Sequence, residues 1–181
     1  MDQRSVAGVL FELVQGDLTE QDTEAIVNAA NSSLLGGGGV DGAIHRAAGP
    51  ALLEACRVLS RERGPLPAGE ALVTPGFGLK CPFVIHTVGP VWLGGGRGEA
   101  ETLARCYRSV LRIAREQALR SVAFPSISTG AYGYPIGKAA SVALRTVQAE
   151  VSGSPLEKVR FVLWGAADYA TYAEALAALA G

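Results

Sequence analysis

Four consecutive glycines open the stretch Gly36-Gly37-Gly38-Gly39-Val40-Asp41-Gly42, which runs directly into Ala43-Ile44-His45-Arg46-Ala47-Ala48. Glycine packs no core and raises the conformational entropy that folding must overcome, so such a run is typical of backbone that has to approach something bulky. The residues after it have the spacing of a helix, whose first N–H groups are unpaired and whose dipole favours negative charge. We therefore predict that this loop binds a phosphate or diphosphate group.

On both sides of this loop, short apolar runs alternate with segments of helical spacing. The runs predicted as strands lie at residues 9–14, 25–31, 71–74, 83–88, 121–125 and 159–164. A helical turn is expected at 18–21 with Thr19 as its cap, and helices at 41–48, at 50–60, from Glu99, at 135–151 and from Asp168. Nearly continuous apolar strands between helices predict an α/β sheet covered on both faces. Because the sequence shows no repeat or linker, we expect one domain over residues 1–181.

The composition predicts a buried core and shows no strong charge bias. Of the 181 residues, 49% are hydrophobic, and the formal net charge is −1, which argues against a generally basic nucleic-acid binder. The three cysteines form no Cys-x-x-Cys pair, so a disulfide framework and a zinc site are both disfavoured. No segment reaches the ~18 apolar residues of a membrane span. We expect a cytoplasmic protein without metal, cofactor or membrane partner, from a GC-rich bacterium because alanine, glycine and arginine are abundant.

A second loop, residues 126–134, also follows a predicted strand and precedes a predicted helix. In open α/β sheets, ligands bind at the carboxyl ends of the strands, so the two loops side by side would offer N–H groups to two linked phosphates. The alternative is that both are ordinary tight turns, which Ser/Thr/Gly clusters also form. A further glycine-rich segment, residues 94–98, is predicted to be a mobile connection to the helix that starts near Glu99.

The dinucleotide-binding fingerprint fits the sequence less well. Gly37, Gly39 and Gly42 satisfy the pattern G-x-G-x-x-G, but that motif needs its first glycine directly at the end of a strand. Here residues 31–35 intervene, and Glu62, at about the spacing of the ribose-binding acid, falls in or just after a helix. A nucleotide-dependent oxidoreductase is therefore disfavoured.

Five short motifs follow one another along the chain. They are Gly16-Asp17-Leu18-Thr19, Asn28-Ala29-Ala30-Asn31, the glycine loop with Ala43-Ile44-His45, Ile85-His86-Thr87-Val88-Gly89-Pro90, and Ser126-Ile127-Ser128-Thr129-Gly130 with Tyr132-Gly133-Tyr134-Pro135. Together they resemble a macrodomain, and most closely the MacroD-type ADP-ribosyl hydrolases. Each motif alone is unspecific, but five in order, over nearly the whole chain, are a specific signal. The resemblance implies a three-layer α/β/α sandwich with a mixed, mostly parallel sheet.

The resemblance also implies a pocket for ADP-ribose. Asp17 would accept a hydrogen bond from the adenine amino group, and Trp164 would pack against adenine, although an aromatic at a strand end is more often plain core. Backbone N–H groups of the two loops would bind the diphosphate, and Tyr132 would pack against the distal ribose. The implied ligand-binding set is Asp17, Leu18, Gly37, Gly38, Gly39, Val40, Ser128, Thr129, Gly130, Ala131, Tyr132 and Trp164.

Asn31 and Asp41, which bracket the glycine loop, are the implied catalytic residues. By the resemblance, Asn31 would bind hydroxyls of the distal ribose, and Asp41 would position that sugar and the attacking water. Releasing ADP-ribose from an acidic side chain cleaves an ester at the distal ribose, which requires a water held in line and fixed donors for the developing charge. The diphosphate can itself orient this water, so the protein need supply only one or two polar groups.

Structural explanations compete with these roles. Asp is among the best helix caps, so Asp17 could simply cap the turn that follows it, and Asp41 could cap a helix that begins at residue 42. Asn31 could be an ordinary turn residue. His45 and His86 have no evident paired carboxylate in the pattern, so we expect both to be structural and assign neither a catalytic role.

The leading hypothesis is an enzyme, a mono-ADP-ribosyl hydrolase that also deacetylates O-acetyl-ADP-ribose. The second is a module that binds free or protein-linked ADP-ribose without turnover; because such a module needs only the diphosphate and adenine contacts, the presence of Asn31 and Asp41 favours the enzyme. The expected partners are ADP-ribose, O-acetyl-ADP-ribose and ADP-ribosylated proteins, with nucleic acid only as an ADP-ribosylated substrate, and we expect a monomer. Whether the modified group is an acidic side chain, a nucleic-acid end or a small metabolite stays open at this point.

Overall fold

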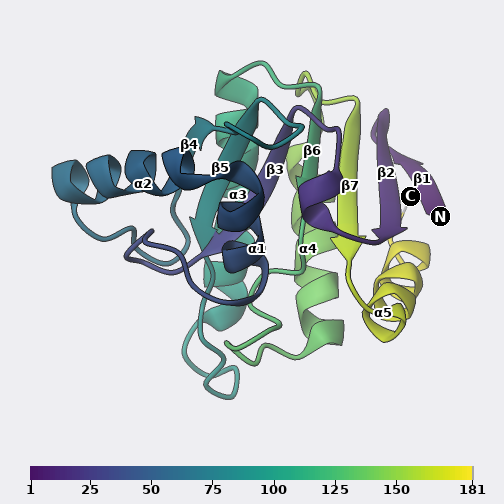
Figure 1. The fold of residues 1–181 in the computed structure, drawn as a ribbon. Helices are drawn as coiled ribbons and strands as arrows, with labels where there is room; N and C mark the ends of the chain where they lie inside the picture. Colours follow the sequence, from purple (N-terminus) through teal and green to yellow (C-terminus); the bar gives the residue numbers. More distant parts are fainter. Residues whose placement is uncertain (181) are drawn as a thin grey trace.

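A seven-stranded mixed sheet forms the centre of the computed structural model, which describes residues 1–180 (Figure 1). The strands are β1 (Asp2–Val6), β2 (Val9–Gln15), β3 (Ala25–Ala30), β4 (Ala71–Pro75), β5 (Phe83–Val88), β6 (Ser121–Phe124) and β7 (Lys158–Leu163). Their order across the sheet is β1-β2-β7-β6-β3-β5-β4. The five inner strands are parallel to one another, and the edge strands β1 and β4 pair antiparallel with β2 and β5.

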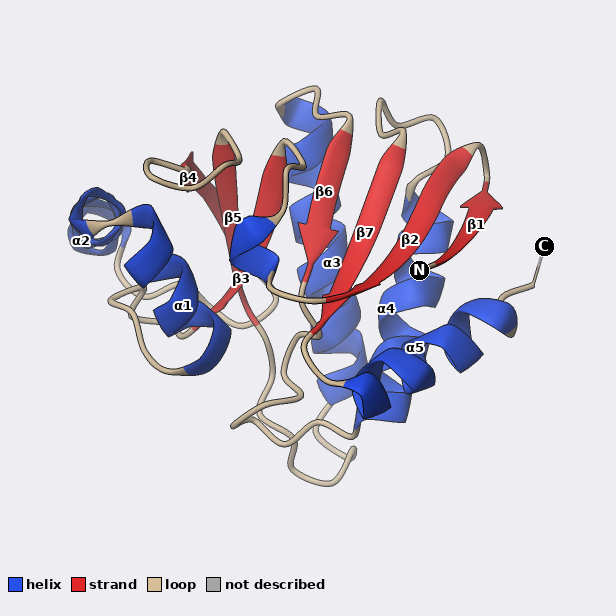
Figure 2. Cartoon of the chain, turned by 45° about the vertical axis from the view of Figure 1, so that its right-hand side comes forward, coloured by secondary structure: helices blue, strands red, loops and turns tan. Residues whose placement is uncertain are grey.

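Helices cover both faces of this sheet (Figure 2). One face carries the 3₁₀ turn η1 (Leu18–Glu20), α1 (Gly39–Ala48) and α2 (Pro50–Arg63); the other carries α3 (Glu99–Glu116), α4 (Ile136–Glu150) and α5 (Ala166–Ala177). The expected three-layer α/β/α fold with a mixed, mostly parallel sheet is therefore confirmed. Among residues 1–180, no helix combines the length and the apolar character needed to cross a bilayer.

Each side of the sheet has its own apolar core, and the inner strands contribute to both. On β3, Ile26 packs with the cluster under α1 and α2, whereas the next residue, Val27, packs with the cluster under α3 and α4. Both side chains are fully buried. This alternation explains why the inner strands are apolar at nearly every position: successive side chains point to opposite faces, and both faces are covered.

The edge strand β1 was not predicted from the sequence. Its residues are mostly polar and exposed, so the segment lacks the apolar run that identifies the inner strands. It pairs with β2 through a tight hairpin in which Ala7 and Gly8 both have positive φ, 50° and 82°, as the two-residue turn of such hairpins requires. Backbone pairing and turn geometry, rather than buried apolar surface, place this strand.

The parallel strands all end at one edge of the sheet, and the loops that leave them meet there. They are residues 16–17 after β2, 31–38 after β3, 89–98 after β5, 125–135 after β6 and 164–165 after β7. Because these strands run in the same direction, motifs far apart in the sequence come together at their carboxyl ends. This edge contains the cleft described next.

Candidate functional site

Two adjoining cavities form a cleft over the carboxyl ends of the strands. Their volumes are about 390 Å³ and about 540 Å³, within the ~300–1,000 Å³ typical of ligand pockets. They share Gly39 and Val40 at the start of α1 and Ser126 and Gly130 in the loop after β6. The two predicted loops therefore form the middle of the cleft, with one cavity on each side of them.

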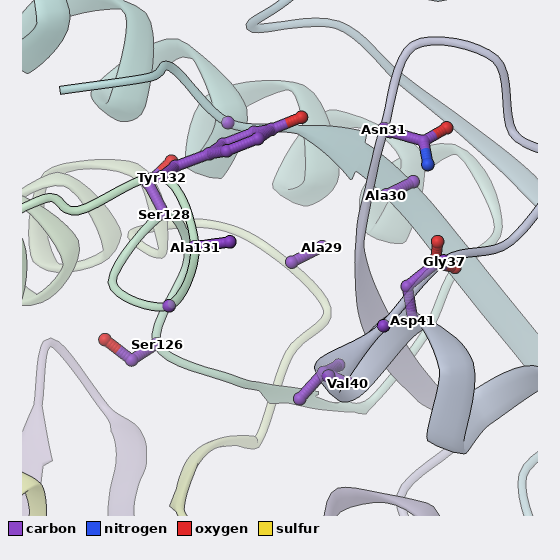
Figure 3. Close-up of a pocket in the computed structure, with 14 residues that line it drawn as sticks. Ala29, Ala30, Asn31, Gly37, Val40, Asp41, Ser126, Ser128, Ala131 and Tyr132 are labelled. Atoms are coloured by element: carbon purple, nitrogen blue, oxygen red, sulfur yellow. The ribbon is translucent and has the colours of Figure 1, made fainter.

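The cleft is lined by every residue that the sequence analysis singled out as binding or catalytic. The first cavity, shown in Figure 3, is lined by Asn31, Gly37, Gly38, Gly39, Val40, Asp41, Ser128, Gly130, Ala131 and Tyr132. The second is lined by Asp17, Leu18, Gly39, Val40, Thr129, Gly130 and Trp164. The structure thus brings these residues together; the role of each is a separate question.

The glycine loop presents the uncapped start of a helix to the cleft. α1 begins at Gly39 with Gly38 as its N-cap, and no side chain in the described part of the chain caps it. Its first N–H groups are therefore left for an anion at the positive end of the helix dipole. Gly36 and Gly39 have φ of 87° and 59°, which side-chain-bearing residues rarely adopt, so the glycines at these two positions are a backbone requirement.

The loop after β6 faces the glycine loop across the cleft (Figure 3). Ser128 adopts a φ of 67° although it is not glycine, and its buried Oγ has no hydrogen-bond partner within residues 1–180. The loop turns back on itself, with the N–H of Tyr134 donating to the carbonyl of Ser128 at 2.9 Å. A constrained turn of this kind holds its N–H groups in a fixed direction, as anion binding requires.

The segment 94–98 is held by a buried carboxylate and is not the mobile connection that was predicted. Glu99 is 2% exposed and accepts hydrogen bonds from the backbone N–H groups of Leu93, Gly95 and Arg97 at 3.0, 2.7 and 2.6 Å. Burial opposes ionisation of this carboxyl, but the N–H donors outweigh it, so its pKa lies below the ordinary value. Glycines in a sequence indicate a flexible segment, but here the backbone N–H groups of the segment are hydrogen-bonded to one carboxylate, which orders it.

The same loop contacts the Tyr132 side of the cleft through Trp92. The backbone N–H of Trp92 donates to the carbonyl oxygen of Tyr132 at 2.9 Å, and the indole ring of Trp92 lies against Tyr134 with 4.6 Å between ring centroids. These two contacts with Trp92 hold the backbone of Tyr132 and the ring of Tyr134 in position. The sequence analysis missed this role of Glu99 and Trp92, because nothing in the pattern says which N–H groups a distant carboxylate will accept.

Asp41 is a buried carboxylate in the wall of the first cavity. Its Oδ1 accepts a hydrogen bond from Asn28 Nδ2 at 2.9 Å, and His45 Nε2 lies 3.4 Å from the same oxygen. Since Asp41 lies inside the first turn of α1 and Gly38 is the N-cap, the explanation of Asp41 as a helix cap is wrong. The statement that His45 lacks a paired carboxylate is also wrong, because the i,i+4 spacing on α1 places it beside Asp41.

Asn31 lies across Gly37 from Asp41 (Figure 3). A Cβ atom at Gly37 would be 3.3 Å from Asp41 Oδ2 and 3.4 Å from Asn31 Nδ2, so both polar atoms are close to the same backbone position. Asn31 Nδ2 donates to the carbonyl of Gly36 at 2.8 Å, and Oδ1 accepts from Ser33 Oγ at 2.5 Å. Asn31 thus shapes the loop and faces the cavity at the same time.

The second cavity combines a carboxylate with an exposed indole. Asp17 caps η1 through Oδ1, which accepts from the N–H and the hydroxyl of Thr19 at 2.8 and 2.7 Å. The prediction of Thr19 as the cap is therefore wrong, while the cap role of Asp17 leaves its other oxygen for a ligand. Trp164 is 79% exposed at the end of β7, so it is not a core residue.

Several lining residues were not singled out from the sequence. The first cavity also includes Ala29, Ala30, Gly89 and Ser126, and the second includes Arg46 and Asp168. Small residues that form the floor of a cavity carry no chemical signal of their own. Arg46 is exposed on α1, where a sequence pattern alone indicates only a solvated helix face.

The comparisons with known proteins agree with this geometry. A family model described as Macro domain matches residues 27–143. A Macro domain-containing protein of Chlorobaculum tepidum is 56% identical over 171 residues, 94% of this chain and 97% of that protein. An O-acetyl-ADP-ribose deacetylase of Salmonella typhimurium is 52% identical over 167 residues, 92% of this chain and 93% of that protein.

Solved structures show the same similarity. A structure of the Oceanobacillus iheyensis macrodomain with ADP has a TM-score of 0.93 and 47% identity, and the match covers 97% of this chain and 94% of that one. A Trypanosoma brucei macrodomain in complex with ADP-ribose has a TM-score of 0.84 and 41% identity, with coverage of 92% and 68%.

Proposed function

Since the chain belongs to the macrodomain family, we propose that it binds ADP-ribose and hydrolyses esters at the distal ribose. O-acetyl-ADP-ribose is the first proposed substrate, supported by the name of relatives about half identical to this chain. Mono-ADP-ribosylated acidic side chains of proteins are the second, because they present an ester on the same sugar. Both reactions need the same cleft and release ADP-ribose.

The ligand orientation follows from the chemistry of the two cavities. The shared middle of the cleft, with the start of α1 and the loop after β6, suits the diphosphate. The cavity with Trp164 and Asp17 suits adenine, which offers a flat ring for stacking and an amino group for a carboxylate. The distal ribose then lies in the first cavity, between Tyr132 and the pair formed by Asn31 and Asp41.

One observation carries the proposal of an enzyme: Asp41 Oδ2 and Asn31 Nδ2 both lie close to Gly37 on the wall of the cavity assigned to the distal ribose. A carboxylate can accept a hydrogen bond from a ribose hydroxyl or from water, and an amide can donate one to a hydroxyl oxygen. Fixed groups of this kind place sugar and water for attack without reorganisation during the reaction.

The reaction is the hydrolysis of an ester, and water is the only reactant it needs besides the ester. The water oxygen bonds to the ester carbonyl carbon, the bond from that carbon to the ribose oxygen breaks, and the sugar regains its hydroxyl. ADP-ribose and a carboxylic acid are released, so acetate forms from O-acetyl-ADP-ribose. A diphosphate bound in the middle of the cleft, as proposed, would be next to the distal ribose and could orient the water.

The alternative function is a binding module that recognises ADP-ribose without turnover. Incubation with O-acetyl-ADP-ribose and, separately, with a mono-ADP-ribosylated protein distinguishes the two, with the products identified by mass spectrometry. We expect free ADP-ribose from both substrates. A binding module would retain both substrates intact, while release from only one of them would identify which ester the site accepts.

A further inference from the structure

A chain of buried polar side chains crosses the sheet beneath α1 and ends at Asp41. Thr74 Oγ1 lies 2.9 Å from His86 Nε2, His86 Nδ1 lies 3.1 Å from Asn28 Nδ2, and Asn28 Nδ2 lies 2.9 Å from Asp41 Oδ1. The residues belong to the adjacent strands β4, β5 and β3, on which Asn28 and His86 are direct register partners. Asn28 and His86 are fully buried, and Thr74 is 3% exposed.

The direction of each hydrogen bond in this chain is determined by its members. Burial, with a smaller contribution from His45, lowers the pKa of His86 to about 3, so its imidazole is neutral. Asn28 Nδ2 can only donate, so His86 Nδ1 must accept, and the remaining N–H on Nε2 must donate to Thr74. His86 is therefore in the Nε2–H tautomer.

The contact with Asp41 fixes the amide of Asn28 in one orientation. Its two N–H groups go to His86 Nδ1 and Asp41 Oδ1, and turning the amide over would put its oxygen against the carboxylate oxygen of Asp41, where neither oxygen can donate. Asn28 Oδ1 has no hydrogen-bond partner within residues 1–180, which is costly for a buried group. An apolar residue here would avoid that cost, so the amide is best explained by what it does to Asp41.

We propose that Asn28 and His86, with Thr74 behind them, are positioning residues that orient the Asp41 carboxylate for catalysis. With Oδ1 engaged by Asn28 and faced by His45, the other oxygen, Oδ2, is directed to the region of Gly37 and Asn31. Because Asn28 is a neutral amide, it orients the Asp41 carboxylate without adding a charge of its own beside it. The inference rests on the function proposed above and identifies groups that act on the same site without touching the substrate.

Two substitutions of His86 test this role. Asn and Leu side chains have similar shapes, but only Asn offers a hydrogen-bond acceptor. His86→Asn places an amide oxygen near the position of Nδ1 and so keeps an acceptor for Asn28, whereas His86→Leu keeps the volume and removes the acceptor. The measurements are kcat on O-acetyl-ADP-ribose, the Kd of ADP-ribose by calorimetry, and Tm. We expect His86→Leu to lose about tenfold or more in kcat, since small misplacements of a catalytic group are costly. We expect His86→Asn to retain most of kcat, and both variants to bind ADP-ribose as the wild type does.

The outcomes separate this inference from the proposed function. If the wild type cleaves neither O-acetyl-ADP-ribose nor the mono-ADP-ribosylated protein, the proposed function fails. If the wild type cleaves either ester and His86→Leu is equally fast on it, or His86→Asn falls as far as His86→Leu, the positioning role is overturned. Nitrogen NMR of the histidine rings in the intact wild type provides a test that holds even if His86→Leu does not fold. We expect His86 to have a protonated Nε2 and an unprotonated Nδ1 at neutral pH, and a protonated Nδ1 would overturn the proposal.

Discussion

His45 Nε2 lies 3.4 Å from Asp41 Oδ1, one helical turn away on α1, so an imidazole and a carboxylate face each other at the wall of the cleft. Both groups are largely buried, and Asn28 contacts the same carboxylate oxygen from the sheet side. Asp41 is thus held from the helix and from the sheet at once. Its second oxygen is left toward the cavity, where a substrate would meet it.

Asp41→Asn separates the charge of this residue from its shape. If the carboxylate orients the ribose or the water, hydrolysis should fall by about a hundredfold or more, in the range of lost acid–base or electrostatic groups. The affinity for ADP-ribose should change little, because backbone N–H groups bind the diphosphate. Since Gly38 and not Asp41 caps α1, any loss of Tm reports the contacts to Asn28 and His45 and not a lost cap.

Turnover on O-acetyl-ADP-ribose and calorimetric binding of ADP-ribose are the two measurements for Asp41→Asn. Asn31→Ala should also reduce turnover, by loosening the ribose, and provides a second point on the same wall of the cavity. Turnover by Asp41→Asn at the wild-type rate would refute the catalytic role and leave Asp41 as a structural residue.

Trp164→Ala should weaken ADP-ribose binding without unfolding the protein. Stacking of a base on an aromatic ring is worth about 1–3 kcal/mol, so the Kd should rise by about fivefold to a hundredfold. Trp164→Phe and Trp164→Tyr should recover most of the affinity, because each retains a flat ring. The indole is 79% exposed, so Tm without ligand should stay unchanged in all three variants. A Kd equal to that of the wild type would place adenine elsewhere.

ADP-ribose should stabilise the fold more than AMP does. At a ligand concentration about a hundred times Kd, binding adds roughly 2.7 kcal/mol to the free energy of unfolding. AMP occupies only the cavity with Trp164 and part of the diphosphate site, so it should give a smaller shift at equal concentration. Differential scanning fluorimetry measures both shifts. The absence of a shift at millimolar ADP-ribose would contradict the assignment of the cleft.

The inner strands and the site loops could be predicted because each had a local signal. Continuous apolar runs identified strands such as β5, and glycines with the start of a helix identified the loop at residues 36–42. The resemblance then placed Asn31, Asp41 and Trp164 at the cleft, and the structure brings them there. Signals of this kind depend on neighbours in the sequence, which is why they can be read without coordinates.

The contacts that could not be predicted join residues far apart in the chain. Asn28 meets His86 because β3 and β5 pair in one particular register, and a shift of one residue would turn one side chain to the other face. The buried acceptor role of Glu99 likewise depends on how residues 93–97 fold back on α3. No local sequence signal identifies either contact, because the fold supplies the partner in both cases.

Gly42→Ala should disturb the glycine loop although alanine favours helices. A Cβ at Gly42 would lie 2.5 Å from the carbonyl oxygen of Gly37, too close for backbone atoms to coexist, so the loop must move. If the shift of the loop removes one hydrogen bond to a charged phosphate, binding loses about 1.5–3 kcal/mol. We therefore expect Gly42→Ala to weaken the affinity for ADP-ribose by about tenfold or more.

Gly137→Ala is the matched control for this change, since Gly137 also lies near the start of a helix. A Cβ there would make only an ordinary contact of 3.9 Å with Thr171 Cγ2. We expect it to add about 0.5–1 kcal/mol to the free energy of unfolding and to leave the Kd of ADP-ribose unchanged. Equal Kd values for the two variants, measured by calorimetry, would show that the position of Gly37 does not matter for binding.

Glu99→Gln should change how the stability of the protein depends on pH. The Glu99 carboxylate accepts three backbone N–H groups, which hold its pKa below the ordinary value despite burial. Between the folded and unfolded pKa values the unfolded chain binds more protons, so stability rises with pH in this window and is lost as pH falls through the folded pKa. The wild type should therefore be more stable than Glu99→Gln near neutral pH, with the gap closing below about pH 4.5 as the carboxyl protonates.

Urea unfolding of both proteins at a series of pH values measures this gap, and Glu101→Gln serves as the control. Glu101 is also in the first turn of α3, but its side chain is 70% exposed and it pairs with Arg108 at the surface. Its substitution should therefore leave the loss of stability at acid pH almost unchanged. Glu99 holds residues 93–97, and the preceding residue, Trp92, donates a backbone hydrogen bond to Tyr132 in the cleft. Glu99→Gln should therefore also weaken ADP-ribose binding, whereas Glu101→Gln should not. A gap that stays constant from neutral pH to acid would mean that the ionised form of Glu99 does not hold the loop.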